Sequence, residues 1–224
     1  MRPLLLLDVD GPLNPFAGKP ERRPDGYTTH RMVLDGWTEQ HPLRVWLNPD
    51  HGRMLTDLAV ECGLDLVWAT TWQHLANTMI APLVGLPELP VIEFGDALGT
   101  AAWKWDAVTT YAGDRPLAWL DDDFHQWRHG RPKFDMARLG RPTLLHTVDA
   151  RIGITYNDLS AVAEWALTLP SDAPAPQAPS PDAPDDTDQT DMSRLAALGT
   201  DEEWVGILQD LNGELAETGR MARD

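Results

Sequence analysis

The chain has very little cysteine: its 224 residues include a single one, Cys62. One cysteine excludes a disulfide within the chain, and it offers no thiolate cluster for a structural zinc site. We therefore expect a protein of a reducing compartment, the cytoplasm.

Long apolar runs are also missing. No stretch approaches the roughly 20 apolar residues that a membrane-spanning helix needs. The N-terminal MRPLLLLDVDG begins with a basic residue and leucines, as signal peptides do, but Asp8 interrupts it before the roughly 7 to 15 apolar residues of such a segment. The sequence predicts no association with a membrane.

Positive charge is scarce, because 18 lysines and arginines stand against 35 acidic residues, for a formal net charge of -17. This balance argues against a broad basic surface that neutralises many nucleic-acid phosphates. The imbalance is concentrated at one end, since residues 170–224 hold 13 of the acidic residues and only 3 of the basic ones. The rest of the chain is mildly acidic, which leaves room for a local basic pocket that binds a nucleotide or a nucleic-acid end.

Two segments at the C-terminal end differ in composition from the rest. Residues 170–191 are rich in Pro, Ala, Ser and Asp and contain no large apolar residue, which predicts a flexible linker. Residues 192–224 place apolar side chains at helical spacing, with Thr200 and Glu203 as a capping box, so we expect a short amphipathic helix. This acidic tail either docks on the body of the protein or on a protein partner, or stays in solvent.

The first 169 residues alternate apolar runs with helical patterns and are expected to form one domain. We expect strands at residues 4–7, 64–69, 89–94, 116–120 and 142–148, and helices at 49–63, around 75–80, at 101–113 and from 156 onward. Strands that alternate with helices of this length are typical of a mostly parallel sheet with helices on both faces. The predicted fold class is α/β with a doubly wound sheet.

Residues 12–48 interrupt this alternation. They contain two β-prone stretches, YTTHRMV and LRVWL, separated by turn-rich sequence. We expect a small β-hairpin flap over the end of the first strand. Trp37 and Trp46 in this flap either stack on a base of a ligand or pin the flap to the body.

Polar side chains follow three of the predicted strands. Asp8 and Asp10 follow the first strand, Thr70 and Thr71 the second, and Asp121, Asp122 and Asp123 the fourth, with Lys104 on the preceding helix. Ligands of open α/β sheets bind at the carboxyl ends of the strands, so these side chains are expected to converge at one edge.

So many carboxylates at one edge need a counter-charge, because they repel one another and are costly to desolvate. Mg²⁺ suits them, since it needs only a few carboxylates and keeps water and substrate phosphate as further ligands. One aspartate could then attack phosphorus as a nucleophile, and another could protonate the leaving oxygen and later activate water. Thr70 and Lys104 would donate to the phosphoryl oxygens.

Four motifs in this order resemble those of the haloacid dehalogenase (HAD) superfamily: DVDG at 8–11, WATTW at 68–72, Lys104, and LAWLDDD at 117–123. The resemblance covers about residues 1–169 and implies a HAD-like, Rossmannoid sheet, Mg²⁺ and phosphomonoesterase activity. It also implies a role for each residue: Asp8 as nucleophile, Asp10 as general acid/base, Thr70 as phosphate holder, Lys104 as stabilising cation, and Asp121 with Asp122 as an acidic pair that binds the metal together with Asp8 and Asp10.

A narrower resemblance rests on WATTWQHLAN (68–77), GLP (85–87), KW (104–105) and LDDD. These stretches are similar to the small HAD domains described from Swiss Army Knife RNA repair proteins. Two motifs leave a choice open. Thr70 is preferred over Thr71 because it directly follows the strand. Alternation along an extended chain sends Asp121 and Asp123 one way and Asp122 the other, and we prefer Asp122 as the direct ligand with Asp121 in support.

Further candidates for contact with substrate are Gly11, Thr71, Arg128 and Arg131. The two arginines either hold a second phosphate or a nucleic-acid backbone, or they are ordinary surface charges. His125 and His129 are four residues apart and could share a metal, but no third ligand is evident, so a solvated loop is preferred.

Together these patterns predict a Mg²⁺-dependent phosphatase that works through an aspartyl phosphate. A small flap leaves the crevice open to a nucleotide or a nucleic-acid end as readily as to a small phosphorylated metabolite. A sugar phosphatase is the alternative within catalysis. A binding or regulatory module without turnover is an alternative of another class, against which the presence of both Asp8 and Asp10 argues.

Overall fold

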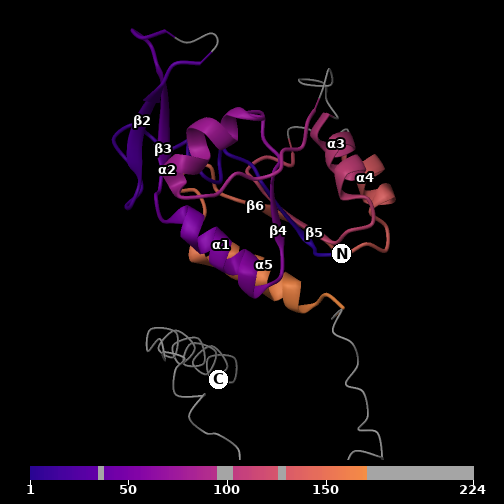
Figure 1. Ribbon diagram of the computed structural model, residues 1–224. Coiled ribbons are helices and arrows are strands. Elements are labelled where there is room, and N and C mark those ends of the chain that lie inside the picture. Colours follow the sequence, from indigo (N-terminus) through magenta and orange to yellow (C-terminus); the bar gives the residue numbers. More distant parts are fainter. Residues whose placement is uncertain (35–37, 95–102, 126–129, 171–224) are drawn as a thin grey trace, which may run out of the picture. The chain divides into compact units, whose positions relative to one another are not determined.

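Four parallel strands form the central sheet of the computed structural model, which describes residues 1–34, 38–94, 103–125 and 130–170. The strand order is β4 (Asp65–Trp68), β1 (Leu4–Leu7), β5 (Leu117–Asp121) and β6 (Thr143–Thr147), and all three pairings are parallel. Helices α1 (His51–Glu61) and α5 (Tyr156–Leu167) cover one face, and α3 (Trp103–Ala112) and α4 (Arg131–Ala137) cover the other (Figure 1). The predicted α/β fold is confirmed.

The four leucines of β1 are fully buried. Leu5 and Leu7 pack into the apolar cluster that contains side chains of α1 and α5, whereas Leu4 and Leu6 pack into the cluster beneath α3 and α4. Successive side chains of a strand point to opposite faces, so a strand that is covered on both sides needs apolar residues at every position. The run LLLL therefore fits the middle of the sheet.

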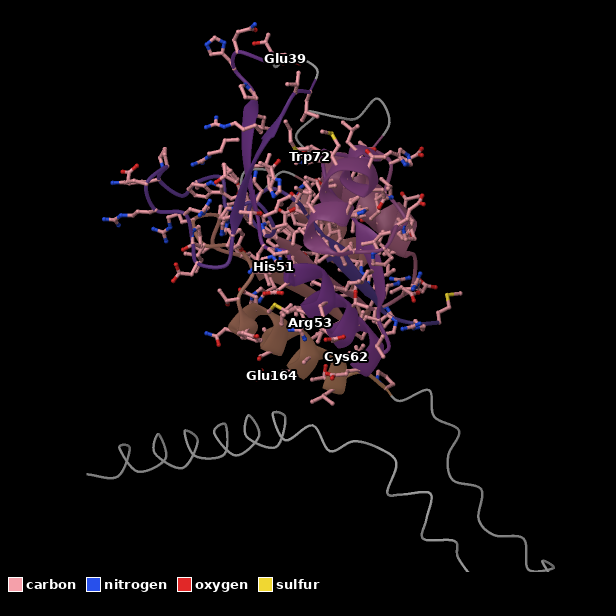
Figure 2. All side chains as sticks on the ribbon, turned by 60° about the vertical axis from the view of Figure 1, so that its left-hand side comes forward. Glu39, His51, Arg53, Cys62, Trp72 and Glu164 are labelled. Carbon is pink, nitrogen blue, oxygen red and sulfur yellow. The ribbon has the colours of Figure 1, made fainter. Side chains whose placement is uncertain are left out.

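A two-stranded hairpin follows β1 in the chain. Strands β2 (Thr28–Met32) and β3 (Leu43–Leu47) pair antiparallel, with Thr28 opposite Leu47 and Met32 opposite Leu43. Figure 2 shows Glu39 at the end of this hairpin that lies farthest from the sheet. Val45 and Leu47 are buried in the same cluster as α1, so the base of the hairpin is part of the core. The predicted hairpin after the first strand is confirmed.

The strand expected at residues 89–94 is wrong. Only Val91 forms a bridge there, parallel to Trp68 and outside the named strands. At this bridge the Trp68 N–H donates to the Pro90 carbonyl and the Ile92 N–H donates to the Trp68 carbonyl, both at 2.9 Å. The side chain of Asn77 fixes the preceding residue, because its amide nitrogen donates to the Leu89 carbonyl at 2.7 Å and its oxygen accepts the Leu89 N–H at 3.0 Å. Pro90 has no N–H to donate to a strand ladder. The sheet thus has four strands in the described residues, not five.

The helical segment expected around residues 75–80 is present in an unusual form. Residues Ala76–Ile80 form the π-helix η1, which continues into the short α2 (Ala81–Val84). Gly85 ends α2 with a left-handed backbone (φ 81°), a conformation that glycine adopts without a steric penalty.

Helix α4 lies in a stretch where the sequence predicted no helix, only basic residues that either bind a phosphate or are ordinary surface charges. Gly130 and Pro132 at its start argue against a helix in the sequence, but proline is tolerated in the first turn of a helix. Phe134 anchors the helix, since it is buried against Trp105 and Trp119 at ring-centroid distances of 4.9 and 6.3 Å. One buried aromatic residue fixes a helix of only seven residues.

Several predicted features fall outside the described residues. These are Trp37, Arg128, His129, the linker beyond Pro170 and the amphipathic helix within 192–224. The domain boundaries and the role of the tail therefore stay predictions. Within the described residues, the helices are too short or too polar to cross a bilayer.

Candidate active site

Asp8 directly follows β1 at the carboxyl edge of the sheet. Its backbone N–H donates to the Leu120 carbonyl at 3.0 Å, which extends the pairing with β5 by one residue. Its Oδ1 accepts the Val9 N–H at 2.7 Å. The side chain is 7% exposed, so a nearly buried carboxylate is fixed in place by the backbone around it.

Lys104 of α3 connects Asp8 to β5. Its buried ammonium donates hydrogen bonds to Asp8 and, at 2.6 Å, to Oδ2 of Asp121, the last residue of β5. Burial alone would lower the pKa of Lys104, but the negative charges of Asp8 and Asp121 outweigh it and raise the pKa above its ordinary value. The ammonium therefore stays charged between the two carboxylates.

Asp8, Asp121 and Asp122 form an acidic group, and each offers an oxygen within 4.8 Å of the other two. Burial first, and the charge of Asp8 second, raises the pKa of Asp121 well above its ordinary value and that of Asp122 to about 6. The single ammonium of Lys104 does not balance three carboxylates. Oxygen ligands gathered in this way fit a hard divalent cation such as Mg²⁺.

Gly11 lets Asp122 approach the loop after β1. Its φ is +88°, and a Cβ at this position would lie 2.3 Å from the Cβ of Asp122. A side chain is therefore excluded for two reasons, the left-handed backbone and the collision. The close approach of backbone to Asp122 explains a glycine here, and contact of Gly11 with substrate stays a prediction.

Asp123 lies in the turn after β5 and shapes it. Its N–H donates to Oδ1 of Asp121 at 3.1 Å, and its own Oδ1 accepts the N–H of His125 at 2.9 Å. The alternation expected for an extended chain does not separate Asp121 from Asp122, because β5 ends at Asp121 and the chain turns directly after it. Both residues thus belong to the acidic group.

Asp10 accepts one hydrogen bond at each carboxyl oxygen. The Asn14 amide donates to Oδ1 at 2.8 Å, and the Trp72 indole N–H donates to Oδ2 at 2.9 Å. Burial first, and the charge of Asp8 second, raises the pKa of Asp10, whereas these two hydrogen bonds lower it in part. The net result is a carboxyl group that holds its proton more firmly than an ordinary aspartate.

Thr70 and Thr71 differ in their surroundings. Thr70 is fully buried, and its hydroxyl accepts the N–H of Trp72 at 3.3 Å. Its carbonyl accepts the side-chain amide of Gln73 at 3.1 Å, and Gln73 itself has a positive φ of 48°. Thr71 is exposed. The tight turn after β4 thus turns Thr70 toward the interior and Thr71 toward solvent.

Two other candidates, Arg131 and Trp46, have partners outside the acidic group. Arg131 begins α4, where it forms an ion pair with Asp135 at 2.7 Å and lies 5.7 Å from the ring of Trp105. Trp46 is 2% exposed, so it has no free ring face for a base and fits the alternative that it pins the hairpin. Arg44 covers the Trp46 ring at 3.9 Å.

Asn14 and Trp72 were not among the residues that the sequence singled out as functional. Trp72 is the last residue of the WATTW motif, which the sequence does mark, but nothing in the motif indicates that the indole N–H of Trp72 binds Asp10. Asn14 carries no sequence signal at all. Its contact with Asp10 depends on the tight turn after β1, in which the Asn14 N–H donates to the Val9 carbonyl at 2.8 Å.

Comparison with known families decides the classification. The sequence model of the family described as the HAD domain in Swiss Army Knife RNA repair proteins matches residues 4–149. The chain belongs to this family. The matched range contains the whole acidic group, Lys104 and the β2–β3 hairpin, and membership makes the protein a HAD-superfamily hydrolase. No curated protein and no solved structure matches the chain.

Proposed function

We propose that this HAD hydrolase is a Mg²⁺-dependent phosphomonoesterase that forms an aspartyl phosphate on Asp8. The observation that carries the proposal is the contrast between two neighbouring acids. Asp8 accepts a hydrogen bond from the charged Lys104 ammonium, whereas Asp10 has a raised pKa and, among the described residues, accepts only from the neutral donors Asn14 and Trp72. Two acids in such different surroundings suit a nucleophile and a proton donor.

In the first step, a carboxylate oxygen of Asp8 attacks the phosphorus of the ester. The bond from phosphorus to the leaving oxygen breaks, and Asp10 gives its proton to that oxygen. The product alcohol leaves, and Asp8 carries the phosphoryl group. Lys104 and Thr70 donate hydrogen bonds as charge builds on the phosphoryl oxygens.

In the second step, the ionised Asp10 takes a proton from a water molecule whose oxygen attacks the same phosphorus. The bond from phosphorus to the Asp8 oxygen breaks, and inorganic phosphate is released. Asp8 is again a carboxylate and Asp10 is again protonated, so the cycle is closed.

The acidic group of Asp8, Asp121 and Asp122 would hold the Mg²⁺. When bound, the ion supplies the positive charge that lets a phosphate dianion approach the carboxylates. In the described residues the Asp10 side chain is not part of this group, so a role of Asp10 as a further ligand stays a prediction.

Nucleotide or nucleic-acid end phosphates are the substrates that we propose. Two observations support them. The family is described from RNA repair proteins, and between β1 and α1 the described residues form a two-stranded hairpin and no larger cap, which favours access for a long substrate. A phosphatase of sugars or other small metabolites remains the second candidate, because nothing in the acidic group itself selects the leaving alcohol.

Phosphate release tests the proposal. The full chain is assayed with nucleotides, with 3′- and 5′-phosphorylated oligonucleotides and with sugar phosphates, in Mg²⁺ and in EDTA. We expect Mg²⁺-dependent turnover that is lost in Asp8→Asn and kept in Asp106→Asn, which changes an exposed carboxylate of α3. Hydroxylamine should trap the phosphorylated aspartate as a hydroxamate in the wild type.

Each alternative has a distinct outcome in this assay. Turnover of sugar phosphates alone would favour the metabolite phosphatase. Binding of a phosphorylated ligand without any turnover would favour the regulatory module. Undiminished activity of Asp8→Asn would refute the aspartyl-phosphate mechanism.

A further inference from the structure

The carboxyl group of Asp10 is fixed by two neutral N–H donors from different parts of the chain. Asn14 binds Oδ1 at 2.8 Å from the loop after β1, and Trp72 binds Oδ2 at 2.9 Å from the turn after β4. One donor on each oxygen fixes both the position and the plane of the carboxyl group. Few lone-pair positions remain free on the two oxygens, so the proton of the neutral acid can point in only a few directions.

The indole of Trp72 is itself held in place. Trp72 is 6% exposed, its backbone N–H is bound by the Thr70 hydroxyl, and the next residue, Gln73, adopts a left-handed backbone with φ 48°. Such a conformation is unfavourable for a residue with a side chain and persists only where surrounding contacts impose it. An indole nitrogen can only donate, so Oδ2 of Asp10 has to accept.

The orientation of the Asn14 amide is also determined by its surroundings. Asn14 is 2% exposed, and its oxygen accepts the backbone N–H of Trp46 in β3 at 3.0 Å. Because that N–H can only donate, the amide oxygen must face β3 and the amide nitrogen must face Asp10. Asn14 therefore joins the hairpin to the Asp10 carboxyl group through one buried side chain.

We propose that Trp72 and Asn14 are positioning residues that aim the proton of Asp10 at the leaving oxygen, and that β3 holds Asn14 in this role. The inference rests on the proposed function, since it concerns the proton donor of that reaction. It predicts that loss of either donor harms substrates with a poor leaving group and spares those with a good one. A good leaving group departs without a proton and does not need the acid to be aimed.

The test compares kcat/KM for two monoesters, p-nitrophenyl phosphate and glycerol 2-phosphate, which differ in the need for a proton on the leaving oxygen. For each ester, kcat/KM depends only on the steps up to release of the first product, the alcohol. In Trp72→Phe, which keeps a ring and removes the N–H, we expect a loss of roughly tenfold or more for the alkyl ester and about twofold or less for the aryl ester. Asn14→Ala should shift the selectivity in the same direction, and Asp10→Asn should shift it further.

Trp68→Phe is the matched control. It also removes a buried indole N–H, which donates to Asn77 at 2.7 Å, and it should lower stability without changing the ratio of the two esters. Equal losses for both esters in Trp72→Phe and in Asn14→Ala, or no loss in either variant, would overturn the positioning role alone. If the wild type hydrolyses no phosphomonoester at all, the proposed function falls and this inference falls with it. If one variant does not fold, the other decides.

Discussion

The ammonium nitrogen of Lys104 lies 2.6 Å from Oδ2 of Asp121, and the two side chains are only 8% and 3% exposed. The same ammonium donates to Asp8, which directly follows the neighbouring strand β1. An ion pair this deeply buried contributes little net stability by itself, but removal of one partner leaves an uncompensated charge behind. Lys104 is therefore the counter-charge on which the acidic group depends when no metal is bound.

Replacement of Lys104 by an uncharged residue should make the metal-free protein much less stable. We expect Lys104→Met to lower the free energy of unfolding by about 3 to 5 kcal/mol in EDTA, because Asp8 and Asp121 then face each other unpaired. Mg²⁺ should restore part of the loss. Urea unfolding with and without Mg²⁺ measures both effects. Lys133→Met, which breaks an exposed pair with Asp106, is the control, and an equally small loss in both variants would contradict the role of Lys104.

The contact between Gly11 and Asp122 gives a second prediction. Gly11→Ala combines a strained left-handed backbone with a collision at 2.3 Å, whereas Gly140→Ala has a similar φ of 75° and nothing within 4 Å of the new Cβ. The strain alone costs about 1 kcal/mol, so Gly140→Ala should lose about this amount and keep its activity. Gly11→Ala should lose more stability and most of its phosphatase activity. Similar losses in both variants would show that Asp122 can move away from the new Cβ at little cost in stability or activity.

The parallel sheet and its carboxyl edge could be predicted because their signals are local. An all-leucine strand, alternating helices and acids at strand ends follow from short stretches of sequence. The strand wrongly predicted at residues 89–94 shows the limit of prediction from local signals. Its apolar pattern was correct, but Pro90 has no N–H with which to extend the ladder beyond the bridge between Val91 and Trp68. Asn77, twelve residues away, fixes the backbone of Leu89 instead.

The surroundings of Asp10 were beyond prediction for the same physical reason. Trp72 lies 62 residues from Asp10 in the chain, and its N–H reaches the carboxyl only after β1 and β4 have paired. Asn14 is close in sequence, but its amide is oriented by Trp46 of the hairpin. Residue types at strand ends indicated which acids lie at the carboxyl edge of the sheet, and the packing of separate segments determines how the surroundings of each acid differ from those of its neighbour.

His51 at the start of α1 makes stability depend on pH. His51, labelled in Figure 2, is 2% exposed and contacts Tyr27 edge to face at a ring-centroid distance of 5.3 Å. Burial lowers its pKa from 6.5 to about 4, although Asp50 and the Ile154 backbone raise it. The unfolded chain thus binds more protons between pH 6.5 and 4. The stabilisation is complete above pH 6.5 and is lost as the pH falls through this window, by about 3 kcal/mol at most.

Urea unfolding at pH 6.5, 5.5 and 4.5 measures this dependence. His51→Gln should show a shallower loss of stability on acidification than the wild type does, because its side chain does not titrate. The carboxyl groups with raised pKa values contribute to both proteins alike, so the difference between the two curves isolates His51. Parallel curves would exclude His51 as the source of the pH dependence.

Binding of Mg²⁺ should stabilise the fold through the acidic group. A metal at about a hundred times its dissociation constant adds about 2.7 kcal/mol to the free energy of unfolding, and the thermal midpoint should rise accordingly in the wild type. Asp122→Asn should abolish most of this rise. Asp123→Asn, in the adjacent turn but outside the acidic group, should keep it. A rise that survives Asp122→Asn unchanged would place the ion elsewhere.

The two adjacent threonines provide the last test, because they face opposite environments. Thr70 is buried and its hydroxyl accepts the Trp72 N–H, whereas Thr71 is exposed. In the proposed mechanism the proton of the Thr70 hydroxyl is donated to a phosphoryl oxygen. We expect Thr70→Val to lower kcat about 100-fold, the loss typical of one donor to a developing negative charge. Thr70→Ser, which retains the hydroxyl, should recover most of the rate, and Thr71→Val should leave it nearly unchanged. Steady-state kinetics on one phosphomonoester compares all three, and a larger loss in Thr71→Val would transfer the phosphate-holding role to Thr71.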